Sequence, residues 1–185
     1  MHTFELGPLA DVNCHASDDR WTLVFVRDLR HPPAKVWAAL TDPEQVRQWA
    51  PYDTDTDLST AGEATLTMID GDTSQDMPAQ VRRAEPPRLL EYTWGNDTLR
   101  WELVDIENGT RLTLRHTLED RDWAPKVAGW HICLVVAGYM LDGRPIGPIR
   151  GAAAREYGWD ELNETYAEKL GMKGTGLPGE SGDLS

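Results

Sequence analysis

PPAKVWAALTDPEQVRQWAP (residues 32–51) predicts two short helices in tandem. The paired prolines suit a first helical turn, and the helix expected over 34–40 has one apolar side, formed by Val36, Trp37 and Leu40. Asp42 is a good N-cap, and Pro43 suits the first position of a second helix that runs to about residue 49. Because the two helices meet at an Asp-Pro step, we expect a V-shaped unit.

On both sides of this unit the pattern predicts strands. RWTLVFVRDLR (residues 20–30) is rich in β-branched and aromatic residues and predicts a well-covered strand. After the helices, alternating runs separated by turn residues predict six strands, at 54–58, 63–69, 77–84, 88–94, 97–106 and 110–119. The pair Asn108-Gly109 between two such runs is the strongest hairpin signal in the chain.

A long helix is expected over 123–141, and it is apolar on all sides, so it should be buried on two of them. One side packs on the sheet. The other is covered either by a second subunit or by this chain's own C-terminal segment. The sequence therefore predicts four parts: an irregular leader at 1–19, one domain at 20–142, an extension at 143–170 that packs on the domain or on a partner, and a disordered tail at 171–185.

Charge and composition exclude several classes of function. The 185 residues include 18 basic and 31 acidic side chains, for a net charge of −13. Such a surface repels phosphate backbones and anionic lipid, so we expect neither nucleic acid nor a membrane as partner. Two cysteines are too few for a disulfide framework, and no signal peptide is expected, which predicts a cytoplasmic protein. No spacing of ligating residues indicates zinc, and we expect no metal and no cofactor.

The order of these elements predicts an α+β fold. A curved antiparallel sheet would wrap around the long helix and leave a cavity between them. The chain resembles the START-like, SRPBCC superfamily, whose helix-grip fold also occurs in birch-pollen (Bet v-like) allergens. It is most similar to the activators of heat-shock-protein-90 ATPase (the AHSA-type family). The residues that carry the resemblance are 32–51, AEPPRLLEYTW at 84–94, LRWELVDIENGTRLTLRHT at 99–117 and the helix at 123–141.

That resemblance covers about residues 20–142 and implies a pocket without implying a mechanism. Members of the superfamily bind lipids, sterols and hormones, cyclise aromatic polyketides or act as co-chaperones. Fold alone does not choose among these functions. The leading hypothesis is a protein that holds a small apolar or aromatic ligand, as a carrier or as an enzyme with non-metal acid–base or cyclase-type chemistry. The alternative hypothesis is a co-chaperone-like regulator of a chaperone ATPase. The protein is expected to be a monomer or a homodimer.

Eight tryptophans against two phenylalanines suggest where a ligand would bind. Aromatic rings with a few polar anchors suit a flat apolar ligand, while the alternative interpretation is a filled core. The candidate lining residues are Trp37, Trp49, Tyr92, Trp94, Trp101, His116, Trp130, His131 and Leu134.

Two histidines are the candidate catalytic residues. His116 shares the inward parity of its apolar neighbours, and His131 follows Trp130 on the long helix. An imidazole in a cavity could transfer a proton near neutral pH, whereas a core histidine with satisfied hydrogen bonds would only stabilise the fold. Cys133 lies among apolar residues and is expected to behave as a small hydrophobic side chain.

Overall fold

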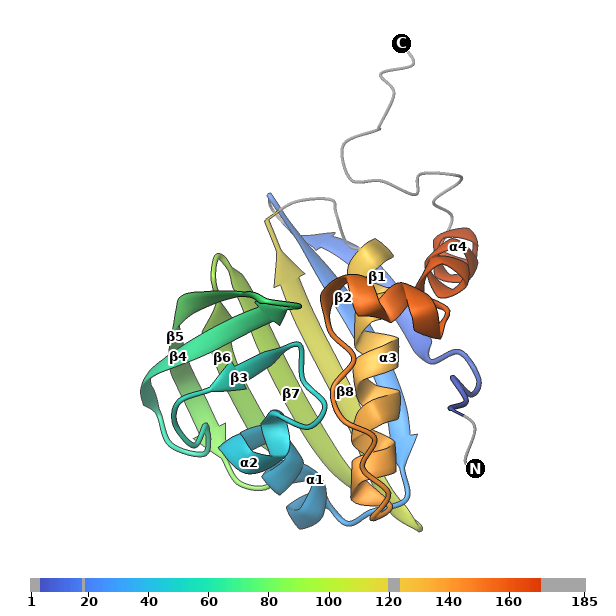
Figure 1. Cartoon of the computed structure of the whole chain (residues 1–185). Coiled ribbons are helices and arrows are strands. Elements are labelled where there is room, and N and C mark those ends of the chain that lie inside the picture. Colours follow the sequence, from blue (N-terminus) through green and yellow to red (C-terminus); the bar gives the residue numbers. More distant parts are fainter. Residues whose placement is uncertain (1–3, 18, 120–123, 171–185) are drawn as a thin grey trace.

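The computed structural model describes residues 4–17, 19–119 and 124–170. Within these residues an antiparallel eight-stranded sheet, in the order β1-β2-β8-β7-β6-β5-β4-β3, curves around one long helix (Figure 1). The strands are β1 (Asp11–Ser17), β2 (Arg20–Leu29), β3 (Tyr52–Thr54), β4 (Gly62–Asp70), β5 (Thr73–Glu85), β6 (Leu89–Trp94), β7 (Asp97–Ile106) and β8 (Gly109–Leu118). The helices are α1 (Pro33–Thr41), α2 (Pro43–Val46), α3 (Ala124–Leu141), the 3-10 helix η1 (Gly151–Tyr157) and α4 (Trp159–Lys169). The predicted α+β helix-grip architecture is confirmed.

The two short helices form as predicted, although the second is shorter than expected. The Asp42 side chain accepts a hydrogen bond from the backbone N–H of Glu44 (3.0 Å) and caps α2. The helix ends at Val46 instead of near residue 49, and the chain continues in turns. Trp49 is buried there and donates its indole N–H to the carbonyl of Ala39 (2.8 Å), which ties the turn back onto α1.

The hairpin of β7 and β8 has the predicted register, and its glycine has an additional role. Asn108 takes the left-handed conformation (φ 72°) in the loop, while Gly109 is the first residue of β8. A Cβ at Gly109 would overlap the carbonyl oxygen of Leu29, so the close approach of β2 requires glycine there. Along β7 the buried residues Leu99, Trp101 and Leu103 alternate with partly exposed ones, as the sequence predicts.

Two predictions about the strands are wrong. The leader at 1–19 is not wholly irregular, because 11–17 forms β1 and pairs with β2 at the edge of the sheet. Its Asp and Asn residues are poor strand formers, and the unpaired edge of β2 supplies the hydrogen bonds that propensity does not predict. The strand expected at 54–58 is β3 at 52–54, because the Asp57 carboxylate accepts the backbone N–H of Ser59 (2.8 Å) and makes a turn.

The outer side of α3 is covered by the chain itself. Residues 142–150 run back along the helix, and η1 and α4 then lie across its outer face beside the N-terminal segment (Figure 1). The Tyr166 hydroxyl of α4 hydrogen-bonds to His131 of α3 (2.6 Å). Of the two covers that the sequence left open, the C-terminal segment therefore occupies this face. The predicted tail at 171–185 and the expected helix start at residue 123 lie outside the described residues.

Candidate ligand-binding site

Most of the predicted aromatic residues fill the space between the sheet and α3. Trp101 is fully buried and packs edge to face against Trp49 (ring centroids 6.0 Å apart) and Trp130 (5.4 Å). Trp94 packs against Trp130 in the same way (5.8 Å). Because such pairs pack closely, the centre of the concave face is a solid aromatic core. The interpretation as a filled core therefore holds for the centre of the molecule.

The polar atoms of this core are satisfied by each other. The Trp101 indole donates to the hydroxyl of Tyr92 (3.1 Å), and the hydroxyls of Tyr92 and Tyr52 share a hydrogen bond. Burial raises the pKa of Tyr92 to about 12, so this phenol stays neutral at physiological pH. These hydrogen bonds fix the orientation of the rings, and the bond between the two hydroxyls uses one of the two phenol hydrogens.

His116 lies in a chain of hydrogen bonds between a carboxylate and an indole. Its Nε2 lies 2.8 Å from Oδ2 of Asp97, and the Trp130 Nε1–H donates to its Nδ1 (3.0 Å). An indole nitrogen can only donate, so Nδ1 is the acceptor and Nε2 carries the proton. Burial lowers the pKa of His116, although Asp97 opposes that shift, and the ring is neutral. Trp130 thus covers the nitrogen that would act as a base.

His131 lies on the opposite side of α3, away from the aromatic core. Its Nε2–H donates to the carbonyl of Leu6 (2.7 Å), and its Nδ1 accepts from the Tyr166 hydroxyl (2.6 Å). The same hydroxyl accepts the backbone N–H of Ala10 (2.9 Å). Burial lowers the pKa of His131 to about 4. This histidine joins three segments of the chain, and it is not among the residues that line the pocket described next.

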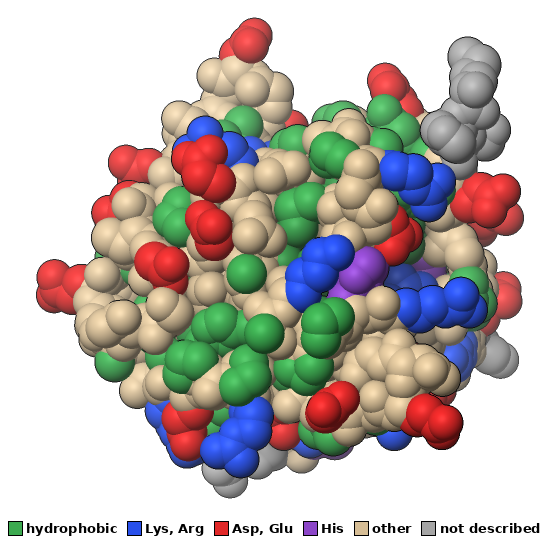
Figure 2. Space-filling view, turned by 90° about the horizontal axis from the view of Figure 1, so that it is seen from below, with side chains coloured by type: hydrophobic (Ala, Val, Ile, Leu, Met, Phe, Trp, Pro, Cys, Tyr) green, Lys and Arg blue, Asp and Glu red, His purple; other side chains and the backbone are tan. Residues whose placement is uncertain are grey.

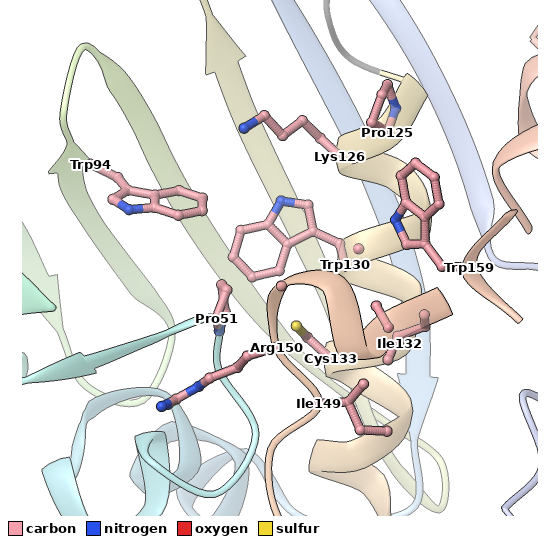
Figure 3. A pocket seen from close by; sticks show the side chains of 13 residues that line it. Pro51, Trp94, Pro125, Lys126, Trp130, Ile132, Cys133, Ile149, Arg150 and Trp159 are labelled. Atoms are coloured by element: carbon pink, nitrogen blue, oxygen red, sulfur yellow. The ribbon is translucent and has the colours of Figure 1, made fainter. Parts of the chain in front are cut away.

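A pocket of ≈ 200 Å³ opens at the edge of the aromatic core (Figure 3). It lies between the turn before β3, the end of β6, the first half of α3 and the C-terminal extension. Its lining residues are Pro51, Trp94, Pro125, Lys126, Gly129, Trp130, Ile132, Cys133, Ile149, Arg150, Gly151, Ala154 and Trp159. Three indole rings and several aliphatic side chains make this surface mainly apolar.

The pocket offers cations and no reactive nucleophile. Burial raises the pKa of the Cys133 thiol to about 12, which keeps it protonated and unreactive, as the sequence predicts. Arg150 reaches from the extension to the carbonyl of Ala50 (2.9 Å) and to Asp53 (2.7 Å). The Lys126 ammonium lies 5.7 Å from the centre of the Trp94 ring. The described residues contain no group of three or more side chains that could hold a metal ion.

Two of the nine predicted lining residues, Trp94 and Trp130, border this pocket. The others lie in the core or outside it: Trp37, Trp49, Tyr92, Trp101, His116, His131 and Leu134 are buried without lining the pocket. The sequence analysis missed Lys126 and the residues of the extension. The apolar residues Ile149 and Trp159 in a segment otherwise rich in polar residues were the available signal.

The geometry places the chain in a known class. A curved antiparallel sheet that grips a long C-terminal helix, with two short helices between β2 and β3, defines the helix-grip proteins of the SRPBCC type. Residues 30–136, more than half of the chain, match the family model described as activator of Hsp90 ATPase homolog 1-like protein. The chain belongs to this family.

Solved structures support the fold. The conserved protein of unknown function EF2215 from Enterococcus faecalis is 17% identical, with a TM-score of 0.66 over 88% of this chain and 92% of that chain. CalU16 from Micromonospora echinospora is 19% identical, with a TM-score of 0.61 over 86% and 95% of the two chains. Both identities are low, so the likeness is one of fold. No curated protein matches the chain in sequence. No helix in the described part of the chain has the length and apolarity to cross a membrane.

Proposed function

We propose that this protein binds a small, largely apolar or aromatic molecule in the pocket between β6, α3 and η1. The observation that carries the proposal is the ≈ 200 Å³ space bordered by Trp94, Trp130 and Trp159. An apolar cavity of about 150 Å³ is enough to bind benzene. A molecule of one or two fused rings therefore matches both the size and the lining of the site.

The proposal is for binding without a catalytic histidine. Trp130 occupies Nδ1 of His116, and His131 lies on the other side of α3. A proton transfer by His116 would first require Trp130 to rotate away. We also propose a cytoplasmic location. Cys14 and Cys133 are both free thiols, which suits a reducing compartment.

Filling the pocket from within tests this function. Gly129 lines the pocket and Gly138 does not, yet both lie in α3, and a Cβ at either position would meet no atom within 4 Å outside the helix itself. The Gly129→Leu variant should lose binding of 2-naphthamide by at least about tenfold, since its side chain occupies ligand space. The matched Gly138→Leu variant should bind like the wild type.

Native mass spectrometry and calorimetric titration are the measurements. Wild-type protein is expected to bind 2-naphthamide, and freshly purified protein to carry extra non-covalent mass that the Gly129→Leu variant lacks. If the wild type binds no naphthalene probe and carries no extra mass, or if both glycine variants bind equally well, the pocket is not a ligand site. Thermal unfolding of both variants confirms that they are folded.

A second candidate function is favoured by the family to which the chain belongs, which is described by the activation of Hsp90 ATPase. A protein-interaction module would act through its surface, where acidic and basic side chains lie beside hydrophobic ones (Figure 2). Addition of the protein to a purified Hsp90-type chaperone should then raise the rate of ATP hydrolysis. The Gly129→Leu variant should raise it equally, because the pocket would not matter. An unchanged rate contradicts this second function.

A further inference from the structure

The pocket has the opposite charge from the rest of the protein. The chain carries a net charge of −13, yet of the described residues that line the pocket two are cationic and none carries a carboxylate. Carboxylates nearby are engaged elsewhere: Asp53 pairs with Arg150, Asp97 lies against His116, and Asp70 accepts the backbone N–H of Ala152 (3.3 Å). A site of this kind favours an anionic group on its ligand.

Arg150 is not the residue that would receive that group. Its guanidinium lies 2.7 Å from Asp53 and 2.9 Å from the carbonyl of Ala50, and its side chain is 11% exposed. These bonds attach the C-terminal extension to the turn before β3. Arg150 therefore closes the pocket, and its charge is largely neutralised by Asp53.

Lys126 is the cation that remains. Within the described residues its ammonium has no ion pair and no hydrogen bond, and its contact is with the face of Trp94 at 5.7 Å. In Figure 3 its side chain extends from α3 toward Trp94, along the edge of the space that Trp130 borders. Its charge also reaches the core, because it acts with burial to lower the pKa of His116. A ligand anion here would meet a cation that has no ion-pair partner among the described residues.

We infer that the ligand is a small aromatic monoanion. Its ring lies among Trp94, Trp130 and Trp159, and its carboxylate or equivalent acidic group lies against the Lys126 ammonium. The inference rests on the proposed function, since it specifies the ligand of the same pocket. The volume limits the ring system to one or two fused rings, and the aromatic walls select a flat one.

The test compares an anion with its neutral isostere. 2-Naphthoate and 2-naphthamide have nearly the same shape, and at neutral pH they differ in charge. Each is titrated calorimetrically into three proteins: the wild type, the Lys126→Gln variant, and the Arg82→Gln variant. Arg82 is an exposed residue of β5 outside the pocket, so its variant controls for the loss of one positive charge from the surface.

The wild type and Arg82→Gln should bind naphthoate about tenfold more tightly than naphthamide, because a charged hydrogen bond in a partly enclosed site exceeds an exposed ion pair. In Lys126→Gln that preference should vanish, while the affinity for naphthamide stays the same. Raising the salt concentration should weaken the binding of naphthoate alone.

Two failures are distinguishable. If naphthamide binds as tightly as naphthoate, or if the preference survives in Lys126→Gln, the anion inference is overturned and the proposed pocket stands. If neither probe binds to the wild type, the proposed function itself fails, and the inference fails with it.

Discussion

The two faces of α3 each bury a histidine, and the two sites differ in what surrounds them. On the sheet side, His116 lies between Asp97 and Trp130, next to a pocket. On the outer side, His131 lies between the carbonyl of Leu6 and the hydroxyl of Tyr166, in a seam between segments. Both rings are neutral, because burial lowers both pKa values. Burial and a neutral ring are therefore common to both histidines, and what distinguishes the two sites is their surroundings.

The largest effect is expected on the sheet side. Trp101 is fully buried between Trp49 and Trp130, so Trp101→Ala would leave a large cavity and remove the hydrogen bond to Tyr92. We expect a loss of about 3–5 kcal/mol in the free energy of unfolding, measured by urea denaturation. Val104→Ala, at an exposed position of the same strand, should change stability by less than about 0.5 kcal/mol. Equal effects of the two substitutions would contradict the solid aromatic core.

A smaller loss is expected from the outer seam. Tyr166→Phe removes a hydroxyl that bonds both His131 and the backbone N–H of Ala10, and it leaves these two buried groups without a partner. The free energy of unfolding should fall by about 1–3 kcal/mol in the same assay. Tyr157→Phe is the matched control, because Tyr157 is 39% exposed and should lose almost nothing. If Tyr166→Phe leaves the free energy of unfolding unchanged, the hydrogen bonds of the seam do not hold α4 in place.

The pH dependence of stability should separate the two histidines. The unfolded chain takes up a proton at His131 below about pH 6.5, whereas the folded chain resists it down to about pH 4, its pKa in the fold. Stability therefore falls as the pH drops through this range, by about 1–2 kcal/mol at pH 5. His131→Gln keeps a donor and an acceptor but cannot titrate, so its melting temperature should fall less between pH 7 and pH 5.

The corresponding His116→Gln variant tests the electrostatic difference between the two sites. Asp97 favours the protonated form of His116 and opposes the effect of burial, so this variant should change the pH dependence less than His131→Gln does. If the two variants have the same pH profile, the seam and the core are electrostatically alike, and the distinction drawn between them fails.

The sequence predicts the fold better than it predicts the site. The Asp42 cap, the Asn108 turn and the alternation along β7 are local signals, and each appears where the sequence places it. The edge strand at 11–17 carries weak local signals and forms because β2 offers it hydrogen bonds. Trp94 and Trp130 were predicted to line the pocket, but Arg150 and Trp159 were not, because the extension is brought to the pocket by tertiary contacts.

The order of elements from β2 to α3 and the burial of α3 follow from the sequence, because capping, turn chemistry and periodicity act over a few residues. Tertiary packing sets which face of α3 meets the sheet. Trp130 and His131 are neighbours in the chain, but a helix turns them about 100° apart around its axis. Since α3 is apolar on all sides, its periodicity does not select a face. Packing places Trp130 at the pocket and His131 in the seam.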